Sequence, residues 1–389
     1  MTVTGPGGFV ASGIACGIKA SGDPDLALLA TDDSRAVPAA AVFTANKATA
    51  APVLTTRAHL ALTGGHAAAV VLNSGNANAA TGSDGRAKAE RTCALVAAEL
   101  GCRPEEVLVC STGLIGIPLP MAPIEKGIAG LVAARRADGG PEAARAMMTT
   151  DTHPKEVLVA GDGWAIGGMA KGAAMLAPNM ATMLAVLSTD ATVGSADLHR
   201  HLQAAVKDSF NALTVDGCTS TNDTVIVLAS GRADTRPPEP AAFGAALAAA
   251  CADLAAQMAG DAEGATKVVR IWVTGAASDA EAAVAARRVA ESQLVKCSFY
   301  GEDPYWGRVV SELGSAGVDF DPDIVAVTYG GETVARHGIA AAHDVRRVKE
   351  HLAGRHVELV ADLGLGTGRG TVLTNDLSHA YIDENMRTS

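Results

Sequence analysis

The segment KGAAMLAPNMATMLAVLSTDA, residues 171–191, is almost entirely apolar, yet it contains Pro178, Asn179 and Thr182. A proline inside a helix removes a backbone donor and clashes with the preceding turn, so a helix is disfavoured here. The run 182–191 is rich in Val, Leu and Thr and predicts a buried strand that follows a Pro-Asn turn. Two interpretations are open at this point. Thr182 is either an ordinary strand residue after a loop or a nucleophile placed at the start of a strand.

Self-cleavage is the chemistry that this threonine would support. A threonine hydroxyl is a weak nucleophile unless a base activates it. If the bond between Ala181 and Thr182 breaks, Thr182 gains an α-amine with a reference pKa of about 7.7, which can accept the proton of its own hydroxyl. Ala181 is small enough to let the hydroxyl attack its carbonyl. An oxyanion hole is also needed, and CSTG at 110–113 is a strand-end turn with amides suited to it.

Other motif-like segments favour structural interpretations. GLGTGRG at 364–370 lacks the GxGxxG spacing with a following helix, because TVLTNDL after it predicts a strand, so we expect a glycine-rich turn. His199 and His201 have no third ligand at metal spacing and predict a helix surface. TVDGCTSTNDT at 214–224 is rich in hydroxyls and carboxylates, and a capped, turn-rich loop is favoured. We therefore expect no metal and no nucleotide cofactor.

Composition restricts the classes of partner. The 389 residues are 48% hydrophobic but only 3% aromatic, so the core must be built from small side chains. The net charge of -11 argues against nucleic acid or an anionic membrane surface as the main partner. The N-terminal sequence does not have the pattern of a signal peptide, and no apolar run long enough to predict a membrane span is identified. Seven scattered cysteines without a CxxC pair predict reduced thiols in the cytoplasm.

Helical and strand-like segments alternate along the chain. Apolar runs that end in glycine or turn residues predict strands at 67–75, 105–113, 223–231 and 267–276. Asp162-Gly163 and Gly330-Gly331 predict the turns of two hairpins, at 156–168 and 325–335. Helical spacing of apolar or alanine residues predicts helices at 85–100, 120–136 and 241–263. This pattern indicates a mixed α/β chain with antiparallel content, without the regular repeat of a doubly wound sheet.

The chain resembles the ornithine acetyltransferase family, the glutamate N-acetyltransferases of the cyclic arginine pathway. KGAAMLAPNMATML matches that family's cleavage-site motif. Further blocks match in order along the whole chain: GFVASGIACGIK, AVFTANKATAAPV, LNSGNANAATG, STGLIG, MTTDTHPK, FNALTVDGCTSTNDT, GDAEGATK, LVKCSFYGEDPYWGRV and TNDLSHAYIDEN. So many ordered blocks make the resemblance specific.

The resemblance implies a fold and an activity. The fold would be an αββα four-layer sandwich of the ornithine acetyltransferase/DmpA-like type, similar in outline to N-terminal nucleophile hydrolases, in residues 1–270, with a smaller lobe in 271–389. The precursor would cut itself between Ala181 and Thr182 into an α chain, 1–181, and a β chain, 182–389, that associate as α2β2. Thr182 would take the acetyl group of N2-acetyl-L-ornithine as an ester and pass it to L-glutamate. Acetyl-CoA is a possible second donor, and no cofactor is implied.

The resemblance also implies the site residues. Thr112 and Gly113 would supply the oxyanion hole through their backbone amides. Substrate would be bound at these positions: Thr149, Lys171, Thr182, Glu263 and Asn385. Lys171 suits the α-carboxylate that both substrates carry, and Glu263 suits an ammonium group or proton transfer with a bound amine. Thr150 is an alternative to its neighbour Thr149.

The C-terminus departs from the family pattern. The family usually continues about five residues past the asparagine and ends in a hydroxyl residue that touches substrate, whereas only MRTS follows Asn385 here. Thr388 or Ser389 is the candidate for that contact. Two other functions stay open from sequence: an N-terminal-threonine amidohydrolase or peptidase that uses water as acceptor, and an uncut, non-enzymatic binding protein.

Overall fold

The computed structural model describes residues 2–175, 183–233 and 236–386, and these form two compact units. Unit 1 comprises the chain up to Asn211 together with Thr219–Met258. Unit 2 comprises Ala212–Cys218 and the chain from Ala259 onward. The expected boundary near residue 270 would cut through strand β11 (Val268–Ala276), all of which belongs to unit 2. The units therefore divide before this strand, at the end of the preceding helix.

Unit 1 contains two β-sheets. The first has the strand order β1-β2-β5-β6 and the second β4-β3-β10-β9-β8-β7. The pairs β5/β6 and β9/β10 are parallel, and the other neighbours are antiparallel. The strands are β1 Phe9–Ile14, β2 Leu26–Thr31, β3 Val37–Phe43, β4 His66–Ala67, β5 Ala69–Asn73, β6 Val107–Ser111, β7 Lys155–Ala160, β8 Ala165–Lys171, β9 Leu184–Thr189 and β10 Thr224–Ala229.

The two sheets pack face to face through small side chains. One buried cluster joins residues of the first sheet, such as Ala27 and Leu29, to residues of the second, such as Ala41 and Val186. Alanine fills many of the positions between the sheets, as expected for a chain with so few aromatic residues. Close packing of small residues brings the two backbones near each other, so that polar groups at the ends of strands in different sheets can meet.

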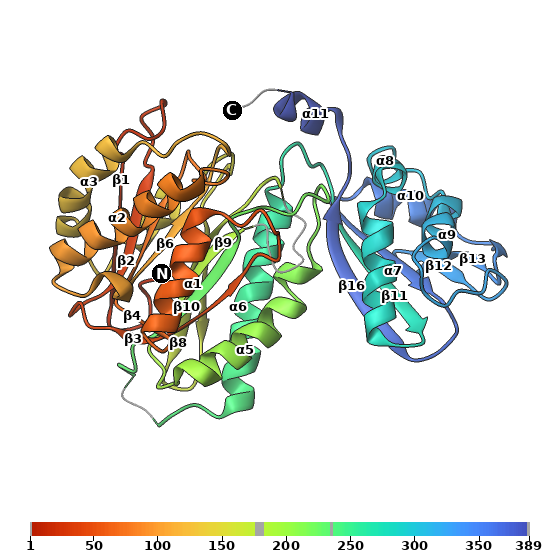
Figure 1. Ribbon diagram of the computed structural model, residues 1–389. Helices are drawn as coiled ribbons and strands as arrows, with labels where there is room; N and C mark the ends of the chain where they lie inside the picture. The colour runs from red at the N-terminus through yellow and green to blue at the C-terminus, as the bar shows by residue number, and fades with distance from the viewer. Residues whose placement is uncertain (1, 176–182, 234–235, 387–389) are drawn as a thin grey trace. The chain divides into compact units, whose positions relative to one another are not determined.

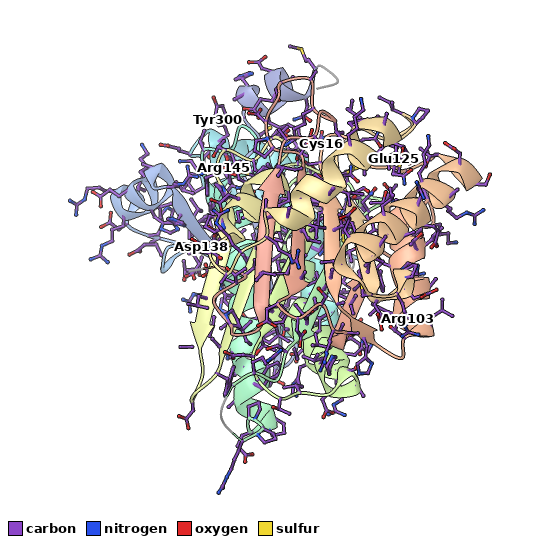
Figure 2. All side chains as sticks on the ribbon, turned by 90° about the vertical axis from the view of Figure 1, so that its left-hand side faces the viewer. Cys16, Arg103, Glu125, Asp138, Arg145 and Tyr300 are labelled. Atoms are coloured by element: carbon purple, nitrogen blue, oxygen red, sulfur yellow. The ribbon has the colours of Figure 1, made fainter. Side chains whose placement is uncertain are left out.

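Helices cover the outer faces of both sheets (Figure 1). A second buried cluster packs helices α2 and α3 on the first sheet, and α5 and α6 lie on the second. Figure 2 shows charged side chains such as Arg103 and Glu125 on the outside of this helical layer. The expected αββα arrangement is confirmed. The helices are α1 Ala51–Leu62, α2 Gly82–Leu100, α3 Met121–Ala133, α4 Gly140–Ala146, α5 Ser195–Lys207 and α6 Pro240–Gly260, with short 3-10 turns at Pro104–Glu106 and Phe210–Ala212.

Unit 2 is one six-stranded sheet with its helices packed on a shared core. The strand order is β14-β13-β12-β15-β11-β16. Alternate residues of β11, such as Ile271 and Val273, are buried against alanines of α7, while Arg270, which precedes Ile271, is exposed. The remaining elements are α7 Asp279–Glu291, α8 Gln293–Tyr300, α9 Trp306–Gly314, β12 Ala326–Tyr329, β13 Glu332–Arg336, β14 Ile339–Ala340, α10 Val345–Ala353, β15 His356–Asp362, β16 Gly368–Asn375 and α11 His379–Asn385.

The two predicted hairpin turns and the predicted glycine-rich turn are confirmed, because they depend on residues that are neighbours in the sequence. Asp162-Gly163 joins β7 to β8, with Gly163 at a φ of 76°, and Gly330-Gly331 joins β12 to β13 with φ values of 55° and 86°. The glycine-rich segment 364–370 turns into β16. By length and composition, α6 could cross a membrane. Its side chains Phe243 and Leu247 are instead buried within the protein.

The packing of α6 gives a stability prediction. Phe243 is 1% exposed and contacts Trp164, with ring centroids 5.6 Å apart. Phe243→Ala should lower the free energy of unfolding by about 3–5 kcal/mol, because the cavity left behind cannot close fully. The matched control Leu62→Ala, at a position 73% exposed, should change it by less than about 0.5 kcal/mol. Urea unfolding measures both, and equal midpoints for the two variants would contradict this packing.

Candidate active site

Lys171 and Thr112 meet although 59 residues separate them in the chain. Lys171 is the last residue of β8 in the second sheet, and Thr112 directly follows β6 in the first. The Lys171 Nζ donates to the Thr112 Oγ1 at 3.3 Å, and the Lys171 side chain is largely buried. The face-to-face sheets thus place a cation beside the strand-end turn that the sequence singled out.

The donors of this turn differ from the expected pair of amides. The Thr112 N–H already donates to the Asn73 carbonyl at 2.9 Å, so it is engaged within the fold. The Thr112 hydroxyl accepts from Lys171, which leaves its own hydrogen available to another acceptor. Within the described part of the chain, the Gly113 N–H donates to no backbone carbonyl. The geometry favours the Gly113 amide and the Thr112 hydroxyl as the two donors.

Gly113 cannot be replaced without strain. Its φ is 126°, and a Cβ built on it would lie 2.3 Å from the Gly75 carbonyl carbon. The neighbouring backbone therefore requires a residue without a side chain at this position. Gly113 is exposed.

A buried amide network supports this turn. The Ser111 Oγ donates to the Asn73 Oδ1 at 2.6 Å, and the Asn73 Nδ2 donates to the Asn76 carbonyl at 2.8 Å. The Asn222 Nδ2 donates to the Ser111 carbonyl at 2.9 Å. These asparagines belong to the blocks LNSGNANAATG and TVDGCTSTNDT, to which the sequence assigned no site role. The repeated asparagines of the first block, at the end of the strand predicted at 67–75, were the signal in the sequence that could have indicated a site role.

Asp151 holds Thr149 and the end of β8 with one carboxylate. Its Oδ2 accepts from the Thr149 N–H at 3.0 Å, and its Oδ1 accepts from the Gly172 N–H at 2.7 Å. The Lys155 Nζ is 2.6 Å from the same Oδ1, and both side chains are fully buried. Burial alone would raise the pKa of Asp151, but the charges of Lys171 and Lys155 and these hydrogen bonds lower it to about 2. The carboxylate is therefore ionised at neutral pH.

The residue after the expected nucleophile is fixed to β10. Thr224 donates its N–H to the Met183 carbonyl at 3.1 Å. Burial of the Asp223 carboxyl raises its pKa well above the usual range, against the lowering effect of the Ser220 side chain, the Lys171 charge and the Met183 N–H. One oxygen of this carboxyl, Oδ2, is buried without a partner among the described residues. The predicted cleavage residues Ala181 and Thr182 lie outside the described residues.

Two predicted substrate-binding residues meet in unit 2. The Asn385 Nδ2, at the end of α11, donates to the Glu263 Oε2 at 2.8 Å and to the Tyr381 carbonyl at 2.9 Å. Glu263 is half-buried and Asn385 exposed. The C-terminal candidates Thr388 and Ser389 lie outside the described residues.

A cavity of about 120 Å³ in unit 2 adjoins Glu263. Its lining includes the carboxylates of Asp216, Glu263, Glu291 and Asp376 together with Lys296. The Lys296 Nζ donates to the Asn375 carbonyl at 2.6 Å and to the Thr374 Oγ1 at 3.0 Å. Burial lowers the pKa of Lys296 to about 8, against the attraction of the nearby carboxylates.

The predicted site residues thus fall into two groups. Thr112, Gly113, Thr149 and Lys171 are brought together in unit 1 by β6, β8 and Asp151, while Glu263 and Asn385 meet in unit 2. Sequence reasoning missed Asp151, although it stands within the block MTTDTHPK. Among the described residues, no cluster of His, Cys, Asp and Glu could hold a metal ion.

The family model of the ArgJ family matches residues 10–388. This chain belongs to the ArgJ family. The arginine biosynthesis bifunctional protein ArgJ of Mycobacterium tuberculosis (strain H37Rv) is 48% identical over 395 residues, which cover 100% of this chain and 96% of the relative. The protein of the same name from Streptomyces avermitilis is 46% identical over 390 residues and is covered fully, as is this chain.

A solved structure of a family member is also similar in part. The ornithine acetyltransferase from Mycobacterium tuberculosis, complexed with ornithine, shares 49% identity over 46% of this chain and 96% of that chain, with a TM-score of 0.44. The full-length family match makes this chain an acyltransferase of arginine biosynthesis, as the sequence predicts.

The buried amine of Lys296 gives a pH prediction. Its folded pKa of about 8 lies below the value of about 10.4 for an unfolded chain, so the unfolded chain binds more protons between these pH values. The contribution of Lys296 to the free energy of unfolding should therefore rise with pH in that window. Relative to Lys296→Met, the wild-type protein should gain more than about 1 kcal/mol between pH 7 and pH 10.

Urea unfolding at a series of pH values measures this difference. The control Lys349→Met, at an exposed position of α10, should show no such change with pH. A constant difference between wild type and Lys296→Met would contradict a depressed pKa at this amine.

Proposed function

We propose that this chain transfers the acetyl group of N2-acetyl-L-ornithine to L-glutamate through an ester on Thr182. Family membership along the full chain supports this reaction. The structural observation that most supports this proposal is the hydrogen bond from the Lys171 Nζ to the Thr112 Oγ1 at 3.3 Å. It sets a cation for a substrate carboxylate beside donors for an oxyanion, which is the combination that acyl transfer between amino acids requires.

Maturation comes first in this proposal. The Thr182 hydroxyl attacks the Ala181 carbonyl, and the chain passes through an ester before water releases residues 1–181 from 182–389. Thr182 is then the N-terminal residue of the second fragment. Its α-amine, with a reference pKa of about 7.7, is neutral often enough near pH 7–8 to act as general base.

Acetyl transfer then proceeds in two half-reactions. The Thr182 hydroxyl loses its proton to the α-amine and attacks the acetyl carbonyl, and the oxyanion receives hydrogen bonds from the Gly113 amide and the Thr112 hydroxyl. Breaking the C–N bond returns the proton to the departing α-nitrogen of ornithine and leaves the acetyl ester. The amine of glutamate attacks this ester in the same way, and N-acetylglutamate leaves.

Substrate recognition follows the charges of the two groups of residues. Lys171 binds the α-carboxylate that both substrates share, and Thr149, held by Asp151, offers a hydroxyl nearby. Glu263 and Asn385 bind the amino-acid part through a carboxylate and an amide. The relatives are called bifunctional, so we include acetyl-CoA as a second donor for glutamate.

The proposal includes the assembly and its surroundings. The two fragments stay associated, and two copies form an α2β2 heterotetramer. No cofactor takes part, and neither nucleic acid nor membrane is a partner. The seven cysteines are all free, which suits the reducing cytoplasm as the compartment of the enzyme.

The cleavage hypothesis predicts the behaviour of Thr182→Ala. This variant should run as one full-length band on a denaturing gel and should lose acetyl transfer, because it lacks both the hydroxyl and the amine that cleavage would create. The wild-type protein should run as two bands. An uncut wild-type chain with full activity would exclude the mechanism, and transfer by Thr182→Ala would exclude this nucleophile.

The same assay identifies the acceptor. Loss of acetylornithine should depend on added glutamate in the wild-type protein. Loss at an equal rate without glutamate would instead make the chain an N-terminal-threonine amidohydrolase that uses water.

The oxyanion assignment predicts the effects of two substitutions at Thr112. Thr112→Val keeps the shape but removes the hydroxyl, and kcat should fall about 10²–10³-fold, as for loss of one oxyanion donor. Thr112→Ser keeps the hydroxyl and should retain most of kcat. Steady-state kinetics on cleaved protein compares the two. Equal kcat values for Val and Ser would show that the hydroxyl is not a donor.

A further inference from the structure

The Asp151 carboxylate lies between two lysines that have different surroundings. Lys155, at the start of β7, is fully buried and 2.6 Å from the Asp151 Oδ1. Lys171, at the end of the neighbouring strand β8, reaches the Thr112 hydroxyl. Gly172, the residue after Lys171, donates its N–H to the same Oδ1 at 2.7 Å. The backbone beside Lys171 is therefore attached to the carboxylate that Lys155 neutralises.

The other charged groups that face Lys171 do not compete in the same way. Burial raises the pKa of the Asp223 carboxyl well above its usual range, which favours its neutral form. The Lys19 Nζ is held by the Pro24 and Met148 carbonyls, both at 2.8 Å, and its charge repels Lys171. Asp151 is ionised, and the charge of Lys171 is the main influence that stabilises its anion. Asp151 is thus the nearby anion toward which the Lys171 side chain would turn if Lys155 were absent.

We propose that Lys155 is a positioning residue for substrate binding: its ion pair with Asp151 keeps the Lys171 ammonium at Thr112, where it binds the substrate α-carboxylate. This rests on the proposed function, and it adds a role for a lysine that does not itself touch substrate. A buried ion pair contributes little net stability compared with an apolar pair of similar size. Stability alone therefore does not require the pair, whereas the charge balance around Lys171 does.

The proposal predicts a specific pattern of kinetic constants. Lys155→Met leaves Asp151 without its partner, and the KM values for acetylornithine and glutamate should rise about tenfold or more, the loss expected for a charge-assisted hydrogen bond. The kcat at saturating substrate should stay within about threefold, because the nucleophile and the oxyanion donors are unchanged. Only protein that has cleaved and that unfolds cooperatively is assayed.

The double variant decides between positioning and a structural role. Asp151→Asn alone supplies the baseline, because its amide oxygen can accept from only one of the Thr149 and Gly172 N–H groups and Lys155 is left buried without its anion. In Asp151→Asn/Lys155→Met the competing anion is also gone, so both KM values should lie within about threefold of those of Asp151→Asn and below those of Lys155→Met. If Lys155→Met does not mature, the comparison of the double variant with Asp151→Asn decides. A KM in the double variant that is well above that of Asp151→Asn overturns the proposal.

Two controls separate this inference from the proposed function. Lys88→Met removes a lysine of another i,i+4 pair, with Asp84 in α2, and should leave both KM values unchanged. Lys171→Met should raise both KM values. If it does not, the proposed carboxylate site is wrong. If Lys171→Met raises the KM values while Lys155→Met does not, or the double variant does not return them to about those of Asp151→Asn, the site stands and the role of Lys155 is wrong.

Discussion

The part of the candidate site that lies in unit 1 depends on the hydrogen bonds and the ion pair of the buried Asp151 carboxylate. A carboxylate removed from water must find donors and cations inside the protein. Asp151 finds them in the Thr149 and Gly172 amides and the Lys155 ammonium. These partners come from the segment before β7, from β7 itself and from the chain that leaves β8. One ion thereby fixes the relative position of the segments that carry two of the expected substrate-binding residues, Thr149 and Lys171.

The two-sheet architecture explains how the remaining donors reach the same place. Thr112 follows a strand of the first sheet, and Lys171 ends a strand of the second. Small residues between the sheets let the strand ends approach within hydrogen-bond distance. The Asn73 backbone carbonyl accepts from the Thr112 N–H, and the Asn222 side-chain amide donates to the Ser111 carbonyl, so the buried backbone around Thr112 is satisfied. The Gly113 N–H donates to no backbone carbonyl among the described residues, and the neighbouring backbone admits only glycine at this position.

Sequence predicted the parts of this arrangement that local chemistry decides. Asp162-Gly163 and Gly330-Gly331 turn where expected, because positive φ values favour glycine whatever surrounds it. The ordered blocks identified the family and its fold. Non-local contacts lie beyond local chemistry: Leu213 pairs with Leu373, so that 212–218 belongs to unit 2 although the segments on either side of it belong to unit 1. The hydrogen bond of the Thr112 N–H to the Asn73 carbonyl is equally non-local. Neither contact leaves a periodic signal in the sequence.

The candidate residues of the two units have different charged surroundings. The chain carries a net charge of -11, so an anion-binding group needs local protection from neighbouring carboxylates. In unit 1 that protection comes from pairing Asp151 with Lys155 and from the burial of Asp223, which raises the pKa of its carboxyl. In unit 2 the cavity beside Glu263 is lined by several carboxylates and by the single buried amine of Lys296. Burial lowers the pKa of that amine. Within unit 1 a buried cation is thus shielded from competing anions, whereas within unit 2 the cavity beside Glu263 has more carboxylates than amines in its lining.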